Sequence, residues 1–156
     1  NQHPVLIEEA ARELENYTAP EIDNCFYALQ DELEKRNIAF EIGDMSLNVE
    51  LAPQRVIVNV QSYIRINNAE QSSDFREFKV DVVHPVYDLI SVANEIASQE
   101  AKYCYFEYVG YMILYPQFVI EKTALSDSTK IYTISDIASK RKFNIAIRGC
   151  AIPPGI

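Results

Sequence analysis

The chain has no tryptophan and only four glycines among its 156 residues. The glycines stand at positions 43, 110, 149 and 155, and this spacing matches no phosphate-binding loop. The two histidines, His3 and His84, are far apart, and no two cysteines have C-x-x-C spacing, so the sequence does not indicate a zinc site. No apolar run reaches the roughly 20 residues that a membrane-spanning helix requires. We therefore expect no membrane span, no metal and no cofactor.

Basic residues are also scarce. Lys and Arg number 14 against 23 Asp and Glu, which gives a formal net charge of -9. The imbalance lies in the first 50 residues, which carry twelve acids and three bases. This charge disfavours binding to nucleic-acid phosphates and favours a basic protein partner, for which Glu8, Glu9 and Glu13 are the candidate residues. The alternative is an ordinary solvated helix face.

The three cysteines, Cys25, Cys104 and Cys150, are an odd number at wide spacings. Cys25 and Cys104 stand in apolar patterns, which are typical of buried free thiols. Free thiols persist in reducing compartments, so we expect a cytoplasmic protein.

The most apolar and aromatic stretch is 101–121, AKYCYFEYVGYMILYPQFVIE. Its residues are apolar on both alternating faces, which predicts a central strand buried on both sides. Gly110 is interpreted as a bulge in that strand, and Pro116 as the point where its pairing ends. The tyrosines leave a second possibility open, a small-ligand pocket between this strand and the preceding helix.

The remaining elements follow from periodicity. Helical spacing begins at Pro4, and a capping box at Thr18 predicts a second helix that ends near Arg36. The period then changes to two, with a turn at Gly43 and Asp44. The strands expected from this alternation are 38–42, 47–51, 55–66, 75–83, 130–135 and 143–148, with a helix at 86–98. Polar residues 67–74 are expected to form a loop.

These elements predict a single α+β domain over residues 1–156. Short connections between the early strands favour antiparallel pairing. We expect one mostly antiparallel sheet of about six to eight strands, with two N-terminal helices and one central helix packed on it.

Glu77-Phe78-Lys79 on the strand 75–83 is the strongest catalytic candidate. Residues two apart on a strand share a face, and this strand is followed by a helix and another strand. The arrangement resembles the PD-(D/E)XK nuclease core over about residues 20–109. The resemblance implies that Glu77 binds Mg²⁺ or Mn²⁺ and that Lys79 activates water. The strand 55–66 lacks the expected aspartate, so Glu50 would have to substitute. Alternating charges on a solvated strand face would give the same pattern.

We therefore predict a non-catalytic intracellular protein-interaction domain of adaptor, chaperone or immunity type. In size, charge and element order the chain resembles the secretion-chaperone class, whose sheets bind extended peptides or dimerise. Its partner would be a protein, and a homodimer is one form of this. A PD-(D/E)XK-like nuclease, degenerate or active, and a small-ligand-binding domain are the alternatives.

Overall fold

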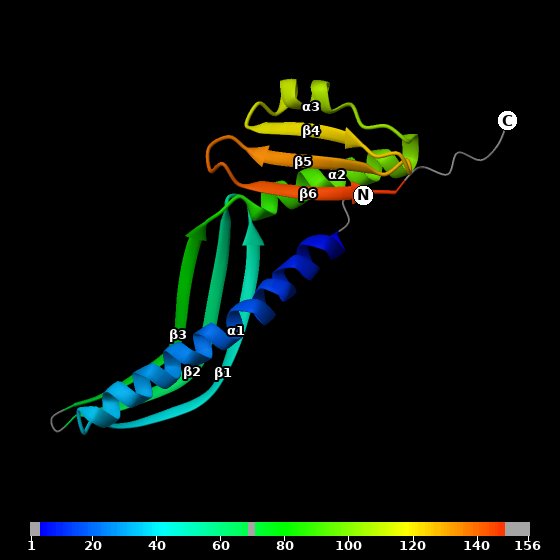
Figure 1. Cartoon of the computed structure of the whole chain (residues 1–156). Coiled ribbons are helices and arrows are strands. Elements are labelled where there is room, and N and C mark those ends of the chain that lie inside the picture. Colours follow the sequence, from blue (N-terminus) through cyan, green and yellow to red (C-terminus); the bar gives the residue numbers. More distant parts are fainter. Residues whose placement is uncertain (1–3, 69–70, 149–156) are drawn as a thin grey trace. The chain divides into compact units, whose positions relative to one another are not determined.

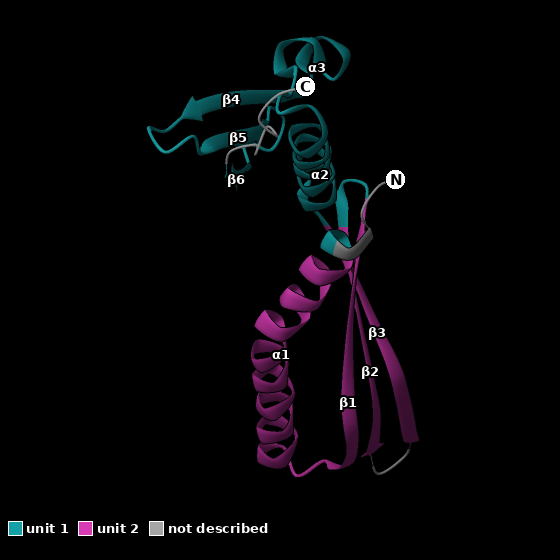
Figure 2. Ribbon diagram, turned by 90° about the vertical axis from the view of Figure 1, so that its right-hand side faces the viewer, with its two compact units in different colours: residues 1–7, 53–55, 83–156 teal, residues 8–52, 56–82 magenta. Residues whose placement is uncertain are grey.

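The structure is a computed structural model that describes residues 4–68 and 71–148 (Figure 1). The elements are α1 (Pro4–Lys35), β1 (Ala39–Ala52), β2 (Arg55–Asn68), β3 (Gln71–Val83), α2 (Val86–Tyr103), α3 (Tyr108–Leu114), β4 (Phe118–Ala124), β5 (Lys130–Asp136) and β6 (Lys142–Ile147). They divide into two compact units (Figure 2). Unit 1 comprises residues 1–7, 53–55 and 83–156, and unit 2 comprises residues 8–52 and 56–82.

Unit 2 is a three-stranded sheet of order β1-β2-β3 with α1 packed against it. Phe26 of α1 meets Phe78 of β3 edge-to-face, with 6.0 Å between ring centroids. Buried apolar side chains come from α1, β1 and β2: Leu33, Val49, Leu51, Val60 and Ile64. Because none of these buried side chains comes from β3, the core of this unit lies under β1 and β2.

The N-terminal segment is one long helix, so the prediction of two helices is wrong. Pro20 lies inside α1, and the predicted capping threonine donates its hydroxyl back to the Leu14 carbonyl at 2.7 Å instead of capping a new helix. Proline removes one helical hydrogen bond. The apolar stripe that contacts the sheet continues beyond it through Phe26 to Leu33, and this packing keeps both halves in one helix.

β1 is a single 14-residue strand, whereas the sequence predicted two strands and a turn at Gly43. Gly43 is a point of close approach to the next strand. A Cβ on it would lie 3.4 Å from the Cβ of Tyr63, and the Ser62 hydroxyl donates to its carbonyl at 3.3 Å. The glycine therefore accommodates a neighbouring backbone rather than a reversal of the chain. The predicted loop 67–74 is shorter, because β2 extends to Asn68 and β3 begins at Gln71.

Unit 1 places α2 against the antiparallel sheet β4-β5-β6. Register aligns Ile120 with Ile134 and Ile134 with Phe143, so one apolar row crosses all three strands. The residues of the buried cluster are Leu89, Val92, Ala93, Ile96, Phe106, Phe118, Ile120, Tyr132 and Ile134. α2 contacts β5 and β6, and α3 contacts β4.

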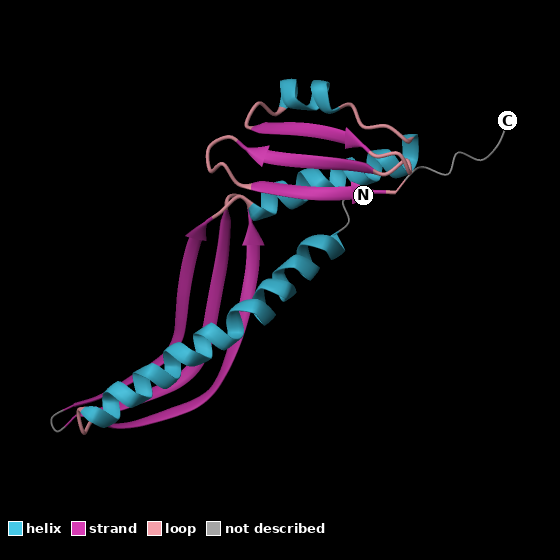
Figure 3. Cartoon of the chain, in the orientation of Figure 1, coloured by secondary structure: helices cyan, strands magenta, loops and turns pink. Residues whose placement is uncertain are grey.

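The segment 101–121 is not a central strand. α2 continues to Tyr103, Cys104 ends it in the left-handed conformation (φ 58°), and a short helix precedes β4 (Figure 3). Gly110 lies inside α3, where its N–H donates to the Glu107 carboxylate at 3.2 Å, so it is not a bulge. Apolar residues on every side satisfy a strand and a short helix equally well, so this pattern could not distinguish them.

This difference explains why the predicted single sheet is wrong. The structure has two separate three-stranded antiparallel sheets, not one sheet of six to eight strands. The predicted central strand was the element that would have joined the early strands to the late ones. Because this segment is helical at 101–103 and 108–114 and becomes a strand only from Phe118, no strand joins the two groups in the described residues, and β1-β2-β3 and β4-β5-β6 each pair among themselves.

Candidate functional site

The residues of the nuclease hypothesis lie on unit 2. Glu77 and Lys79 are exposed on β3, and Glu50 is exposed on β1, with β2 between the two strands. Glu77 lines a polar depression of about 230 Å³ together with Ser46, Asn48, Asn59 and Gln61. Neither Glu50 nor Lys79 lines it. In the described ranges 4–68 and 71–148, no group of three or more His, Cys, Asp or Glu side chains is placed to hold a metal ion.

The predicted interaction residues Glu8, Glu9 and Glu13 are exposed on the first turns of α1. Glu9 forms an ion pair with Arg12 at 3.8 Å between Oε1 and Nη2. An exposed pair of this kind contributes little to stability. These carboxylates therefore form an exposed acidic surface on α1.

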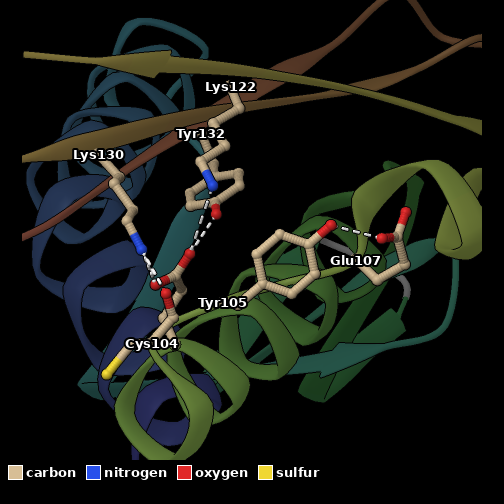
Figure 4. A network of polar contacts seen from close by, with 7 residues as sticks. Cys104, Tyr105, Glu107, Lys122, Lys130 and Tyr132 are labelled. Carbon is tan, nitrogen blue, oxygen red and sulfur yellow. Dashed lines mark hydrogen bonds and ion pairs between the residues drawn. The ribbon is translucent and has the colours of Figure 1, made fainter. Parts of the chain in front are cut away.

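A buried polar cluster is centred on a residue that the sequence did not suggest, Glu100, and Figure 4 labels its partners Lys122, Lys130 and Tyr132. Its side chain is 1% exposed at the last turn of α2. Lys130 Nζ of β5 lies 2.5 Å from Oε2, the Tyr132 hydroxyl donates to Oε1, and Lys122 Nζ of β4 lies 3.8 Å from Oε1. We call these four residues the Glu100 cluster.

The register of the sheet assembles this cluster. Lys122 pairs with Tyr132 across β4 and β5, and residues two apart on a strand share a face, so Lys130 lies on the same face as Tyr132. Glu100 is four residues beyond the buried Ile96 on the apolar stripe of α2. The charged side chains therefore meet where the apolar face of the helix ends over the apolar face of the sheet.

The electrostatics keep Glu100 ionised. Burial by itself would raise the pKa of its carboxyl, but hydrogen bonds from Lys130 and Tyr132, together with the charges of Lys130 and Lys122, hold that pKa below its ordinary value. Burial, followed by the hydrogen bond to the Glu100 carboxylate and its negative charge, raises the pKa of Tyr132. A carboxylate with both oxygens engaged by its own chain is a poor proton acceptor for a substrate. The cluster is a structural link between α2 and the β4–β5 hairpin.

Lys130 also ties this cluster to the end of α2, because its Nζ donates to the Cys104 carbonyl at 2.7 Å. Cys104 is disulfide-bonded, while Cys25 is a free, exposed cysteine. The prediction of buried free thiols is therefore wrong for Cys104, which is not free; for Cys25 the free thiol is confirmed, but the side chain is exposed and not buried. Cys150 lies outside the described residues.

The tyrosine-rich segment does not form the predicted small-ligand pocket between a strand and the helix 86–98. Its residues belong to the end of α2, to α3 and to the connection between them, so this segment is not a strand that faces the helix 86–98, and the strands that α2 contacts are β5 and β6. The Tyr105 hydroxyl donates to the Glu107 carboxylate at 2.5 Å, and this bond lowers the pKa of Glu107 (Figure 4). These tyrosines engage local partners.

The two edges of the β1-β2-β3 sheet differ. On β1, the Val49 N–H donates to the Glu15 carboxylate of α1 at 2.7 Å, and the Asn48 side chain donates to the same oxygen at 3.2 Å. On β3, nearly every residue is exposed, and the exception is Phe78, which meets Phe26 of α1. The exposed apolar residues there are Phe75 (45% exposed), Val80 (55%), Val82 (46%) and Val83 (89%).

No protein-family model matches the chain, and comparison with curated proteins and with solved structures finds no match. Within the described residues, no helix is both long and apolar enough to cross a membrane.

Proposed function

We infer that this chain is a non-catalytic protein-interaction domain that binds a partner along β3. The observation that carries this inference is the contrast between the sheet edges, one engaged by α1 through Glu15 and the other ending in an exposed 13-residue strand. An exposed edge strand is a template for pairing with another chain, and strand addition is a common mode of peptide recognition.

The side chains of β3 support the same conclusion. Phe78, Val80 and Val82 are spaced two apart and share a face of the strand. Phe78 is covered in part by Phe26, whereas Val80 and Val82 stay about half exposed. Apolar residues next to an open edge are a surface that a partner strand would cover.

Other functions have less support. Glu77 shares its depression with no second acid, which does not favour a divalent-metal nuclease. The acidic surface of α1 is a second interaction surface, which would suit a basic segment of the partner. The reducing-compartment expectation rested on free thiols, and the disulfide at Cys104 instead favours an oxidising compartment.

The test is capture by the immobilised domain with a matched pair of double variants. Val80→Thr with Val82→Thr keeps the β-branched shape but replaces two apolar methyl groups with hydroxyls. Val109→Thr with Val119→Thr makes the same change at two exposed valines of unit 1. We expect the β3 variant to bind its partner about tenfold more weakly and the control to bind like the parent.

Equal capture by parent and β3 variant would contradict strand addition at β3. Charge reversal of Glu8, Glu9 and Glu13 tests the acidic surface in the same assay. Its expected effect is a loss of binding that depends on salt, because exposed charges are screened at high ionic strength.

A further inference from the structure

We propose that the partner strand at β3 is β3 of a second copy of this chain, paired antiparallel about a two-fold axis at Phe78. The proposal rests on the proposed function, since it names the occupant of the same edge. Its evidence is the order of charges on β3, where Glu77 and Lys79 flank Phe78 and both are exposed.

The pairing rule of an antiparallel ladder decides which axis fits. When a strand pairs with its own copy about a residue, the preceding residue of one copy lies opposite the following residue of the other. An axis at Phe78 therefore places Glu77 of each copy opposite Lys79 of the other. Side chains directly opposite have Cβ atoms about 4.5–5.5 Å apart, close enough for an ion pair.

Neighbouring axes are disfavoured by the same rule. An axis at Arg76 places two arginines opposite each other, one at Glu77 two glutamates, and one at Lys79 two lysines. Like charges directly opposite destabilise a sheet. An axis at Phe78 brings Glu77 and Lys79 together twice. Axes at Phe75 and Val80 also pair opposite charges, Asp74 with Arg76 and Lys79 with Asp81. Asp74 is already bound by Arg65 of its own chain, and Asp81 also has an interaction there, so Phe78 is the axis whose two charges are both exposed and not so engaged.

The apolar side of β3 fits the same axis. Phe78 lies opposite its own counterpart, so two phenylalanines, each already packed on Phe26 of its own chain, form a cross-strand aromatic pair. Val80 and Val82 extend along the joined strands on that face. The β1-β2-β3 sheets of the two copies thereby become one continuous sheet, and the open β3 edge of each copy is removed.

This arrangement also accounts for Glu77-Phe78-Lys79 without a metal. The tripeptide has the spacing of a catalytic glutamate and lysine, but its acid has no acidic neighbour in its depression. As a self-complementary charge pair across a two-fold axis, the same spacing sets the register of a dimer. In strands with one buried face, register is otherwise set by the apolar pattern.

The test uses charge exchange between copies. Glu77→Lys alone places lysines opposite lysines, and Lys79→Glu alone places glutamates opposite glutamates. By sedimentation equilibrium, each single variant should dimerise at least about 100-fold more weakly than the parent. The double variant Glu77→Lys with Lys79→Glu restores both pairs and should dimerise within about threefold of the parent.

A mixture of the two single variants gives the decisive signature. In such a mixture, the Glu77→Lys chain presents lysine at positions 77 and 79, and the Lys79→Glu chain presents glutamate at both. Native mass spectrometry should therefore detect a heterodimer at concentrations at which neither variant alone forms a homodimer. Far-UV circular dichroism verifies that each variant is folded. If Glu77 and Lys79 acted only within their own chain, mixing the two single variants would not restore dimerisation.

The outcomes separate the two proposals. A parent that is monomeric at every concentration, with capture still lost in the Val80→Thr, Val82→Thr variant, would overturn the self-pairing and leave the partner at β3 standing. A parent dimer that is insensitive to both single reversals would place the dimer interface elsewhere and also overturn the self-pairing. Insensitivity to the reversals together with unchanged capture by the valine variant would overturn both.

Discussion

Replacement of Glu100 by glutamine is the sharpest test of what holds unit 1 together. The carboxylate is 1% exposed and receives Lys130 and the Tyr132 hydroxyl, with Lys122 at 3.8 Å. Glutamine preserves the shape but loses the charge, and one of its two acceptor oxygens becomes an NH₂ donor. The cluster would then hold two lysine charges and no acid.

The size of the effect follows from the burial of the partners. Removing one member of a buried ion pair costs about 3–5 kcal/mol, because the other charge is left uncompensated. Lys130 and Lys122 remain 21% and 20% exposed, so water can compensate them in part. We therefore expect the free energy of unfolding to fall by about 3 kcal/mol, the low end of that range.

Urea unfolding followed by near-UV circular dichroism is the appropriate assay. Seven of the ten tyrosines lie in unit 1, so this signal reports chiefly on the unit that contains the mutation. In thermal unfolding, the same loss corresponds to about 6–12 °C in Tm. The control is Glu95→Gln on the same helix, where the glutamate is exposed and accepts a hydrogen bond from the exposed side chain of Gln99. A Glu100→Gln variant as stable as this control would refute the view that the cluster links α2 to the sheet.

Two further predictions concern the same unit. The pKa of Glu100 is below its ordinary value in the folded chain, so the stability that its charge contributes is present above the unfolded pKa of about 4.3 and is lost as pH falls through the lower folded pKa. In urea unfolding, the difference in free energy of unfolding between the parent and Glu100→Gln should therefore be smaller at pH 3 than at pH 7. A difference that stays constant with pH would contradict this. Alkylation without reductant, followed by peptide mapping, should find Cys25 modified and Cys104 unmodified, and Cys104 should react only after reduction. Modification of Cys104 in the unreduced protein would contradict the disulfide.

Several elements could be predicted because their patterns are unambiguous. Alternation identified β2, and the strands expected at 130–135 and 143–148 became β5 and β6, although each boundary shifted by one or two residues at an end. Pro85 before an apolar stripe located the start of α2. The acidic character of α1 and the exposure of Glu77 and Lys79 also follow from local sequence.

Elements whose pattern allows two structures could not be predicted. The segment 101–121 is apolar on every face, and its conformation depends on what covers it. Phe106 of this segment is buried against Tyr132, a contact that the sequence pattern does not reveal. Thr18 resembles a helix cap, yet its hydroxyl donates backward within a continuous helix. Local rules gave the wrong result in both places because tertiary packing selected the alternative.

The Glu100 cluster had a signal that the sequence analysis missed. Glu100 continues the stripe of Ala93 and Ile96, where a charged residue is out of place unless it has a buried partner. Lys122 and Lys130 stand at the ends of alternating apolar rows in the same way. The sequence could have marked each of the three as unusual, but only the register of β4 with β5 brings them together.

Periodicity and charge are properties of neighbouring residues, so the amino-acid sequence alone determined the strands β2, β5 and β6, the start of α2, the acidic first third and the charge order on β3. The tertiary structure decided which strands pair, that two sheets form instead of one, that α1 engages the β1 edge and leaves β3 exposed, and that Glu100 meets two lysines. Each of these depends on residues far apart in the chain, and burial, not local preference, determines the free energy that selects among such arrangements.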